Sequence, residues 1–249
     1  MKKKIENKKP DWRKYLLYTL SAAMLTAPLF VPGMVRAAEP ESEYEKEGGQ
    51  DKEESKRPVS WEFKEGVLTV SGEGEMLDYS GTEEVPWIAV RDSVRKIVIE
   101  EGITSIGKQS FSNFENLEEV VFPETLKIIG NGAFFECSSL AQVILPESVE
   151  RLGAGAFAGC RSLASFSGKG VVIFENFVFE RTALTSFEIP EKTTKVSALT
   201  FLGTPVGEYT VQSANTEFSA KDGVLFNADR SKLEIYPAEK EEKGYQIPE

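Results

Sequence analysis

Two cysteines are the residues of this sequence whose type and spacing most directly suggest chemistry. Cys137 and Cys160 occupy the same position in two matching stretches of sequence, 117–137 and 140–160. If those stretches stack as neighbouring parallel strands, the cysteines lie about 5 Å apart, within the Cα range of a disulfide. Both side chains should then point inward in parallel. That orientation favours two buried thiols, with a disulfide as the alternative.

A series of glutamates recurs at the same spacing, just after each expected strand. Its members are Glu101, Glu124, Glu147 and Glu191. Like charges one strand spacing apart in water repel by only about 1 kcal/mol, so solvated turns can hold them. Carboxylate oxygens are also the ligands that calcium takes. Calcium bridging between the turns is therefore the alternative interpretation.

The composition argues against catalysis. The chain has no histidine among its 249 residues, which removes histidine-based acid–base catalysis, Ser-His-Asp and Cys-His nucleophiles and histidine-ligated metals. Carboxylate-pair hydrolysis is formally open, but the carboxylates fall on turns and in a spacer, without a sign of a shared cleft. A phosphate-binding glycine loop is also absent. We expect that the protein is not an enzyme and that it has no cofactor or metal site.

The elements that must position these residues are sequence repeats, since stretches 117–137 and 140–160 superimpose without a gap. Apolar residues at positions 1, 4 and 6 of each repeat show the alternation of a short strand, and proline at position 7 ends it because proline has no N–H to donate. A fixed period of about 23 residues is typical of units that bury their apolar faces only by stacking. We predict repeats at 94–116, 117–139, 140–162, 163–183 and 184–205.

The repeats predict an aromatic column inside the stack. Stacked strands lie about 4.8 Å apart, so phenylalanines at one repeat position should contact each other. The column is expected to contain Phe111, Phe134, Phe157 and Phe201, with Phe179 placed less firmly. The fourth repeat is degenerate, because residues 167–170 replace the proline turn and the repeat is shorter than those before it.

These repeats resemble the leucine-rich repeats of the BspA type. Three repeats, beginning at Val94, Leu117 and Leu140, match the pattern L-x-x-V-x-I-P-x-x-V-x-x-I-G-x-x-A-F-x-x-C at nearly every defining position. The resemblance covers about residues 58–249. It implies a β-rich solenoid, a right-handed leucine-rich-repeat stack in which each repeat has about 21–23 residues. Most members of this family are secreted or surface-exposed bacterial proteins, and several are linked to adhesion or host-protein binding.

Both ends of the stack need covering. Residues 58–93 are expected to form an N-terminal cap with a β-hairpin that turns at 64–66. Residues 206–249 are expected to hold a hairpin insertion, made of 218–226 and 233–237, and the start of a further repeat at Tyr245. Because the pattern stops within that repeat, we expect a truncated chain or a fragment of a longer protein.

Residues 1–37 are predicted to be a signal peptide. A basic start precedes an apolar run from Tyr15 to Val31, and small residues favour cleavage after Ala37. An uncleaved membrane anchor is the alternative, disfavoured by the prolines and glycine of the run. Residues 38–57 read as a disordered acidic linker. We therefore expect a secreted or cell-surface protein that does not insert into the membrane after signal cleavage.

Charge narrows the class of partner. The net charge is −11, and removing residues 1–37 would take away eight basic and two acidic residues. A surface that acidic argues against nucleic acid and anionic membranes. We expect a monomer that binds a protein ligand, such as a host or neighbouring-cell surface protein.

One face of the strands is the candidate binding surface. Position 5 of each strand points away from the core and is apolar in three successive repeats, at Val98, Val121 and Ile144. Such a row can anchor a partner protein, whereas β-branched propensity is the simpler explanation. The same face carries Lys96, Glu119 and Gln142. The predicted function is protein binding or adhesion. The alternative is a structural spacer, or a fragment whose active or anchoring domain lies beyond residue 249.

Overall fold

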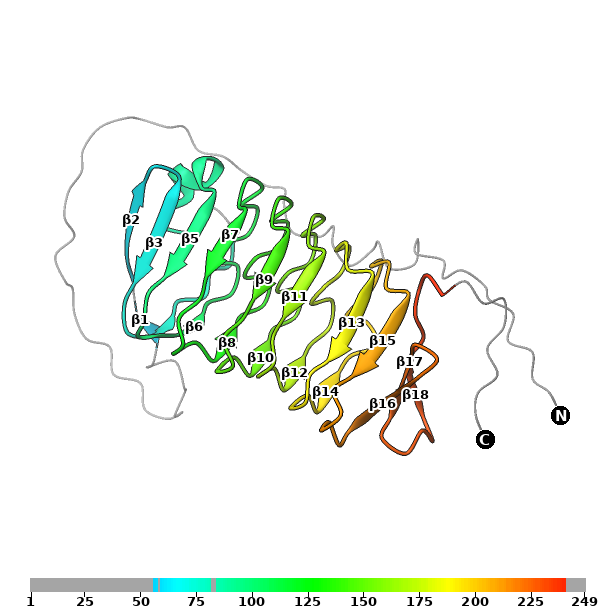
Figure 1. Cartoon of the computed structure of the whole chain (residues 1–249). Helices are drawn as coiled ribbons and strands as arrows, with labels where there is room; N and C mark the ends of the chain where they lie inside the picture. The colour runs from blue at the N-terminus through cyan, green and yellow to red at the C-terminus, as the bar shows by residue number, and fades with distance from the viewer. Residues whose placement is uncertain (1–55, 58, 82–83, 241–249) are drawn as a thin grey trace, which may run out of the picture. The chain divides into compact units, whose positions relative to one another are not determined.

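The computed structural model describes residues 56–57, 59–81 and 84–240, which belong to one compact unit of residues 51–249. The expected signal peptide at 1–37, nearly all of the expected linker and the further repeat at Tyr245 lie outside the described residues. The described part is a β-solenoid in which each repeat contributes two short parallel strands (Figure 1). This confirms the predicted fold.

The first strand of each repeat lies on one side of the solenoid, which we call the strand face. These strands are β5 (Lys96–Ile99), β7 (Glu119–Val121), β9 (Gln142–Ile144), β11 (Ser165–Ser167), β13 (Ser186–Ile189) and β15 (Glu208–Val211). Equivalent residues pair in register, as the pairs Lys96–Glu119 and Val98–Val121 show. The repeat period therefore places each repeat position in a column across the strands.

The second strands form a seven-stranded parallel sheet on the other side of the core. In order they are β1 (Lys56–Arg57), β4 (Gly74–Met76), β6 (Ile103–Ile106), β8 (Ile128–Ile129), β10 (Arg151–Leu152), β12 (Ile173–Phe174) and β14 (Lys195–Val196). The sequence predicted only that these segments return to the core. Strands as short as β8 and β10, with two residues each, show no recognisable alternation.

The N-terminal cap has the predicted hairpin. Strands β2 (Ser60–Lys64) and β3 (Val67–Ser71) pair antiparallel, and the turn has positive φ at Glu65 and Gly66, 50° and 83°. Strand β3 then pairs in parallel with β5. A short 3₁₀ helix, η4 (Ile88–Ser93), leads into the first repeat. Among the described residues, no helix is long and apolar enough to cross a membrane.

Aromatic rings stack along the core as predicted. Phe111, Phe134 and Phe157 follow each other at ring-centroid distances of 5.4 Å. Phe179 and Phe201 continue the column at 6.2 and 5.5 Å. The cap extends it, because Trp87 stacks on Phe111 at 5.1 Å and donates a hydrogen bond from Nε1 to the Ser110 carbonyl. The column therefore links the cap to all five predicted repeats.

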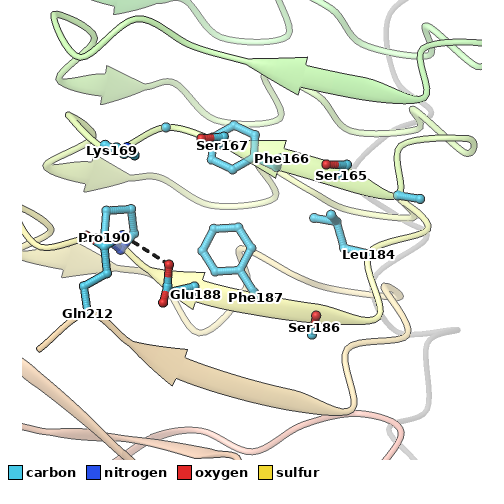
Figure 2. A pocket seen from close by; sticks show the side chains of 12 residues that line it. Ser165, Phe166, Ser167, Lys169, Leu184, Ser186, Phe187, Glu188, Pro190 and Gln212 are labelled. Atoms are coloured by element: carbon cyan, nitrogen blue, oxygen red, sulfur yellow. Dashed lines mark hydrogen bonds between the residues drawn. The ribbon is translucent and has the colours of Figure 1, made fainter.

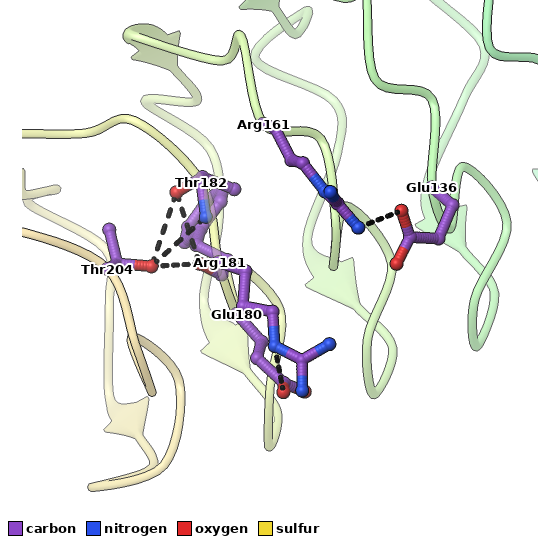
Figure 3. Close-up of polar contacts among 7 residues, drawn as sticks. Glu136, Arg161, Glu180, Arg181, Thr182 and Thr204 are labelled. Carbon is purple, nitrogen blue, oxygen red and sulfur yellow. Dashed lines mark hydrogen bonds and ion pairs between the residues drawn. The ribbon is translucent and has the colours of Figure 1, made fainter.

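Polar contacts between neighbouring repeats lie on the turns beside this column (Figure 3). Arg161 pairs with Glu136 of the preceding repeat at 3.3 Å, and the buried hydroxyls of Thr182 and Thr204 lie 3.4 Å apart. Other ion pairs between repeats include Arg95–Glu118 at 2.7 Å and Lys96–Glu119 at 2.8 Å. Because such pairs are exposed, each contributes no more than about 1 kcal/mol. The packed core supplies most of the stability.

The C-terminal part differs from the expected hairpin insertion. Strand β15 adds a further parallel strand beside β13, where the insertion was expected to begin. Strands β16 (Phe218–Lys221), β17 (Val224–Asn227) and β18 (Leu233–Ile235) then form a three-stranded antiparallel sheet. The segment 218–226 is therefore two strands, because Asp222 and Gly223 make a turn with φ of 51° and 75°. Asp-Gly is a strong signal for such a turn, so the sequence itself contained the correction.

Candidate functional site

The six predicted surface residues lie on the strand face in two rows. Lys96, Glu119 and Gln142 form one row, and Val98, Val121 and Ile144 form the other. Alternation along each strand turns the residues between them, such as Ile97 and Val143, into the core. Strand β9 starts a new sheet beside β7, so each row crosses that boundary without a continuous hydrogen-bond ladder.

The apolar row becomes more exposed along the stack. Val98 is half-buried, whereas Val121 is 39% exposed and Ile144 is 61% exposed. Ile144 has the largest exposed fraction of the exposed large hydrophobic side chains in the described residues. A side chain left this exposed loses part of the transfer free energy of roughly 1.5–3 kcal/mol that burial provides.

A shallow depression of about 660 Å³ surrounds these exposed side chains. Its apolar lining includes Val121, Phe122 and Ile144. Glu124, Glu147 and Lys169 stand among its polar residues. An apolar floor with charged groups beside it is the usual composition of a site that binds part of another protein.

The lysine and glutamate of the polar row neutralise each other. Lys96 Nζ lies 2.8 Å from Glu119 Oε1. Gln142 is exposed and uncharged. This row therefore supplies hydrogen-bonding groups beside the apolar row and little net charge.

The glutamate column is built into the turns. The Glu101 carboxylate accepts hydrogen bonds from the backbone N–H groups of Glu124 and Thr125, at 2.9 and 3.3 Å. It thereby satisfies two donors of the next turn. No group of three or more acidic, cysteine or histidine residues able to hold a metal occurs among the described residues. The solvated-turn interpretation explains Glu101 without calcium.

The two cysteines are buried free thiols, which agrees with the favoured prediction. Each thiol donates to a carbonyl of the preceding repeat, Cys137 to Phe111 and Cys160 to Phe134, both at 3.2 Å. Burial raises the pKa of the Cys137 thiol well above its ordinary value, and Cys160 adds a smaller contribution in the same direction. A thiol held neutral inside the core is a poor nucleophile and a poor metal ligand.

Sequence reasoning missed a second cleft, between β11 and β13 (Figure 2). Among the strands of the described residues, β11 pairs only with β9 and β13 only with β15, so no ladder joins β11 to β13. The cleft has a volume of about 300 Å³, and its lining includes Phe166, Lys169, Glu188 and Gln212. The degenerate fourth repeat was the signal that could have located it.

Comparison with known proteins supports the assignment of the repeats. Residues 90–206 match the family model described as the BspA type leucine rich repeat region, in six copies. No curated protein sequence matches the chain.

Solved structures with a similar fold come from several bacteria. A leucine-rich repeat protein from Eubacterium ventriosum is 27% identical, with a TM-score of 0.65 over 74% of this chain and 50% of that one. The pneumococcal vaccine antigen PcpA is 20% identical, with a TM-score of 0.57, and the match covers 76% of this chain and 57% of that one. A leucine rich cell surface protein from Faecalibacterium prausnitzii is 20% identical, with a TM-score of 0.52 over 77% and 63%. The chain thus spans less than two thirds of the length of each of these relatives.

Proposed function

Because residues 90–206 are a BspA type leucine-rich repeat region, we propose that this chain is an exported surface module that binds another protein through its strand face. The repeats act as a scaffold that presents a surface. We assign them binding and not catalysis.

The exposed apolar row carries this proposal. Val121 and Ile144 lie side by side on neighbouring strands and line one depression, and both remain substantially exposed. Covering such side chains is a main source of affinity at the centre of protein interfaces. The polar row next to them provides the rim, with Gln142 as its uncharged member.

The location is the second half of the proposal. The basic and apolar start of the sequence has the features of a secretory signal, with cleavage after Ala37. Two structural relatives are named as a vaccine antigen and a cell surface protein. We extend that location to this chain, with a host or neighbouring-cell surface protein as the kind of ligand.

The binding proposal can be tested with random linear peptides displayed on phage. Peptides enriched on the wild-type protein would be synthesised and their Kd measured against Val121→Glu and Ile144→Glu. We expect at least about tenfold weaker binding, because each variant places a charge where an apolar contact forms. Thermal unfolding should stay unchanged, since both side chains are exposed.

Leu199→Glu is the matched control. Leu199 is 42% exposed, close to the fraction for Val121, and lies in a turn outside the strand face. It should bind the peptides like the wild type. Equal affinity of Val121→Glu, Ile144→Glu and the wild type would show that the apolar row is not the binding site.

A structural spacer is the second candidate function. The observation that favours it is the partial match, since the region shared with this chain covers only 50% of the Eubacterium ventriosum relative. If no peptide is enriched and a folded wild-type protein is confirmed, the spacer role becomes the better assignment.

A further inference from the structure

We propose that the cleft between β11 and β13 binds a single neutral sugar ring, as a free monosaccharide or as the terminal residue of a glycan. The cleft shares Ser167 and Lys169 with the depression beside the apolar row, but this inference does not rest on the protein-binding proposal. Five observations carry it: how the strands beside the cleft pair, how its turn is shaped, which groups line it, how its charges are arranged, and its size.

Two aromatic rings line the cleft. Phe166 and Phe187 occupy the inward strand position that Ile97, Val120 and Val143 fill in earlier repeats. Their rings stack at a centroid distance of 5.8 Å. Among the described strands, β11 pairs with β9 and β13 with β15, and no ladder joins β11 to β13. The backbone groups along their facing edges are not joined by a ladder and can offer donors and acceptors to a ligand.

The turn after β11 is shaped by glycines. A Cβ at Gly170 would lie 1.9 Å from the Glu147 carbonyl oxygen, and one at Gly168 would lie 2.8 Å from the Phe166 ring. At Gly170 only glycine therefore allows the turn to pack against the third repeat, whereas a Cβ at Gly168 would require the Phe166 ring to shift. The residues that made the fourth repeat look degenerate are those that shape the cleft.

The lining combines an aromatic surface with hydroxyl, carboxylate and ammonium groups (Figure 2). Phe166 is only partly buried. Glu188 Oε2 accepts a hydrogen bond from Gln212 Nε2 at 3.1 Å, and Gln212 Oε1 accepts one from the Glu191 N–H at 2.9 Å. Gln212 thus orients the Glu188 carboxylate. The hydroxyls come from Ser165, Ser167 and Ser186.

The charges of the cleft break the pattern of the stack. Elsewhere, opposite charges on neighbouring repeats pair, as in Arg95–Glu118 and Lys96–Glu119. Lys169 and Glu188 also belong to neighbouring repeats, yet neither forms an ion pair with the other described residues. Both line the cleft, and together they leave it without net charge. That balance favours a neutral ligand that carries both donors and acceptors over an anion or a cation.

The size selects among neutral ligands. The cleft volume of about 300 Å³ is at the lower limit for small-molecule sites. It suits one sugar ring better than a peptide segment. A sugar ring presents hydroxyls around its edge, where they meet the serine, glutamate and lysine groups. Its C–H face is apolar enough to lie on Phe166. We infer that this combination recognises one hexose or N-acetylhexosamine ring.

Saturation-transfer NMR on the whole chain provides the test. The probes are the methyl glycosides of glucose, galactose, mannose, N-acetylglucosamine and N-acetylgalactosamine at millimolar concentration, because a single ring binds weakly. We expect transfer to the ring protons of at least one glycoside. For that glycoside, Glu188→Ala and Lys169→Ala should each raise the Kd about tenfold, the effect of losing a hydrogen bond to a charged group.

Glu191→Ala and Lys192→Ala are the matched controls, since both residues are exposed and neither lines the cleft. The Glu191 N–H that bonds Gln212 belongs to the backbone and is kept in the variant. They should leave the Kd unchanged, as should Val121→Glu, which reports on the protein-binding proposal alone. A longer glycan that ends in the same sugar distinguishes a free monosaccharide from a glycan as the ligand. Tighter binding of the longer glycan would identify the glycan as the ligand. The inference is overturned if no glycoside shows transfer, or if the cleft variants bind like the controls while all variants melt like the wild type.

Discussion

At the scale of single residues, one repeat position shows what the core requires. Cys137 and Cys160 each donate to a carbonyl of the preceding repeat. In the fifth repeat, Thr204 fills the same position and donates to the Phe179 carbonyl. Thiol and hydroxyl are interchangeable in these three repeats because each is a small side chain with one donor. The cysteines are therefore structural.

The buried thiol predicts a dependence of stability on pH. Because burial raises the pKa of Cys137 in the folded state, its neutral form stabilises the fold fully below the ordinary thiol pKa of about 8.5. Above that pH the unfolded chain releases the proton and the folded chain keeps it. The free energy of unfolding should then fall by up to about 1.4 kcal/mol per pH unit. Urea unfolding between pH 7 and 10 measures this.

Cys137→Thr is the control for this prediction, because threonine already occupies the equivalent position at Thr204. Its stability should decline less steeply with pH. Burial also raises the pKa of Tyr209, so some decline remains in the variant. Identical slopes for variant and wild type would mean that the Cys137 thiol is not the titrating group.

At the scale of elements, the aromatic column adds side-chain contacts to repeats that backbone hydrogen bonds already join, such as Phe134 N–H to Ala156 and Phe111 N–H to Ala133. Phe134 stacks on Phe111 and Phe157 at 5.4 Å each, with interplanar angles of 21° and 4°. It is fully buried. Each ring fills the space between its neighbours, so removing one leaves a cavity in contact with two other repeats.

Phe134→Ala should destabilise the protein by about 3–5 kcal/mol, the usual effect of deleting a buried phenylalanine. The next residue is a matched control, because Phe135 is 41% exposed. Phe135→Ala should change the free energy of unfolding by about 0.5 kcal/mol or less. Denaturant titration compares the two variants directly. Similar losses of unfolding free energy in both variants would contradict the conclusion that the aromatic column stabilises the core.

At the scale of the whole described region, the two sides of the solenoid differ in continuity. The strand face is divided into three sheets, β2-β3-β5-β7, β9-β11 and β13-β15. The opposite sheet continues from β1 to β14 without interruption. The continuous sheet and the aromatic column keep the repeats together, which leaves the strand face free to open between β11 and β13.

Hydrogen exchange should detect this asymmetry within one repeat. Strand β11 pairs on one side only, whereas β12 pairs with both β10 and β14. Amides of β11 should therefore exchange faster than those of β12. The first repeat is the internal control, because β5 and β6 both pair on two sides and should be protected alike. Equal protection of β11 and β12 would argue against an open cleft.

Much of this architecture was predictable because one period governs it. The column from Phe111 to Phe201, the buried thiols and the cap hairpin at Glu65 all follow from alternation, spacing and turn chemistry. The second sheet did not, since pairs such as Arg151 and Leu152 are too short to show a period. The cleft was not predictable either. A phenylalanine in place of valine, as at Phe166, indicates a core position but does not indicate how far apart the neighbouring strands lie.

The sequence by itself determined which residues share a column and which way each one faces, because a fixed period in a parallel stack places equivalent residues in register. Only the tertiary structure decided how far apart neighbouring strands lie and how much of each surface side chain remains exposed. Those quantities depend on how side chains from neighbouring repeats pack against each other, as Phe166 and Phe187 do. The exposure of Ile144 and the opening between β11 and β13 both arise at that level.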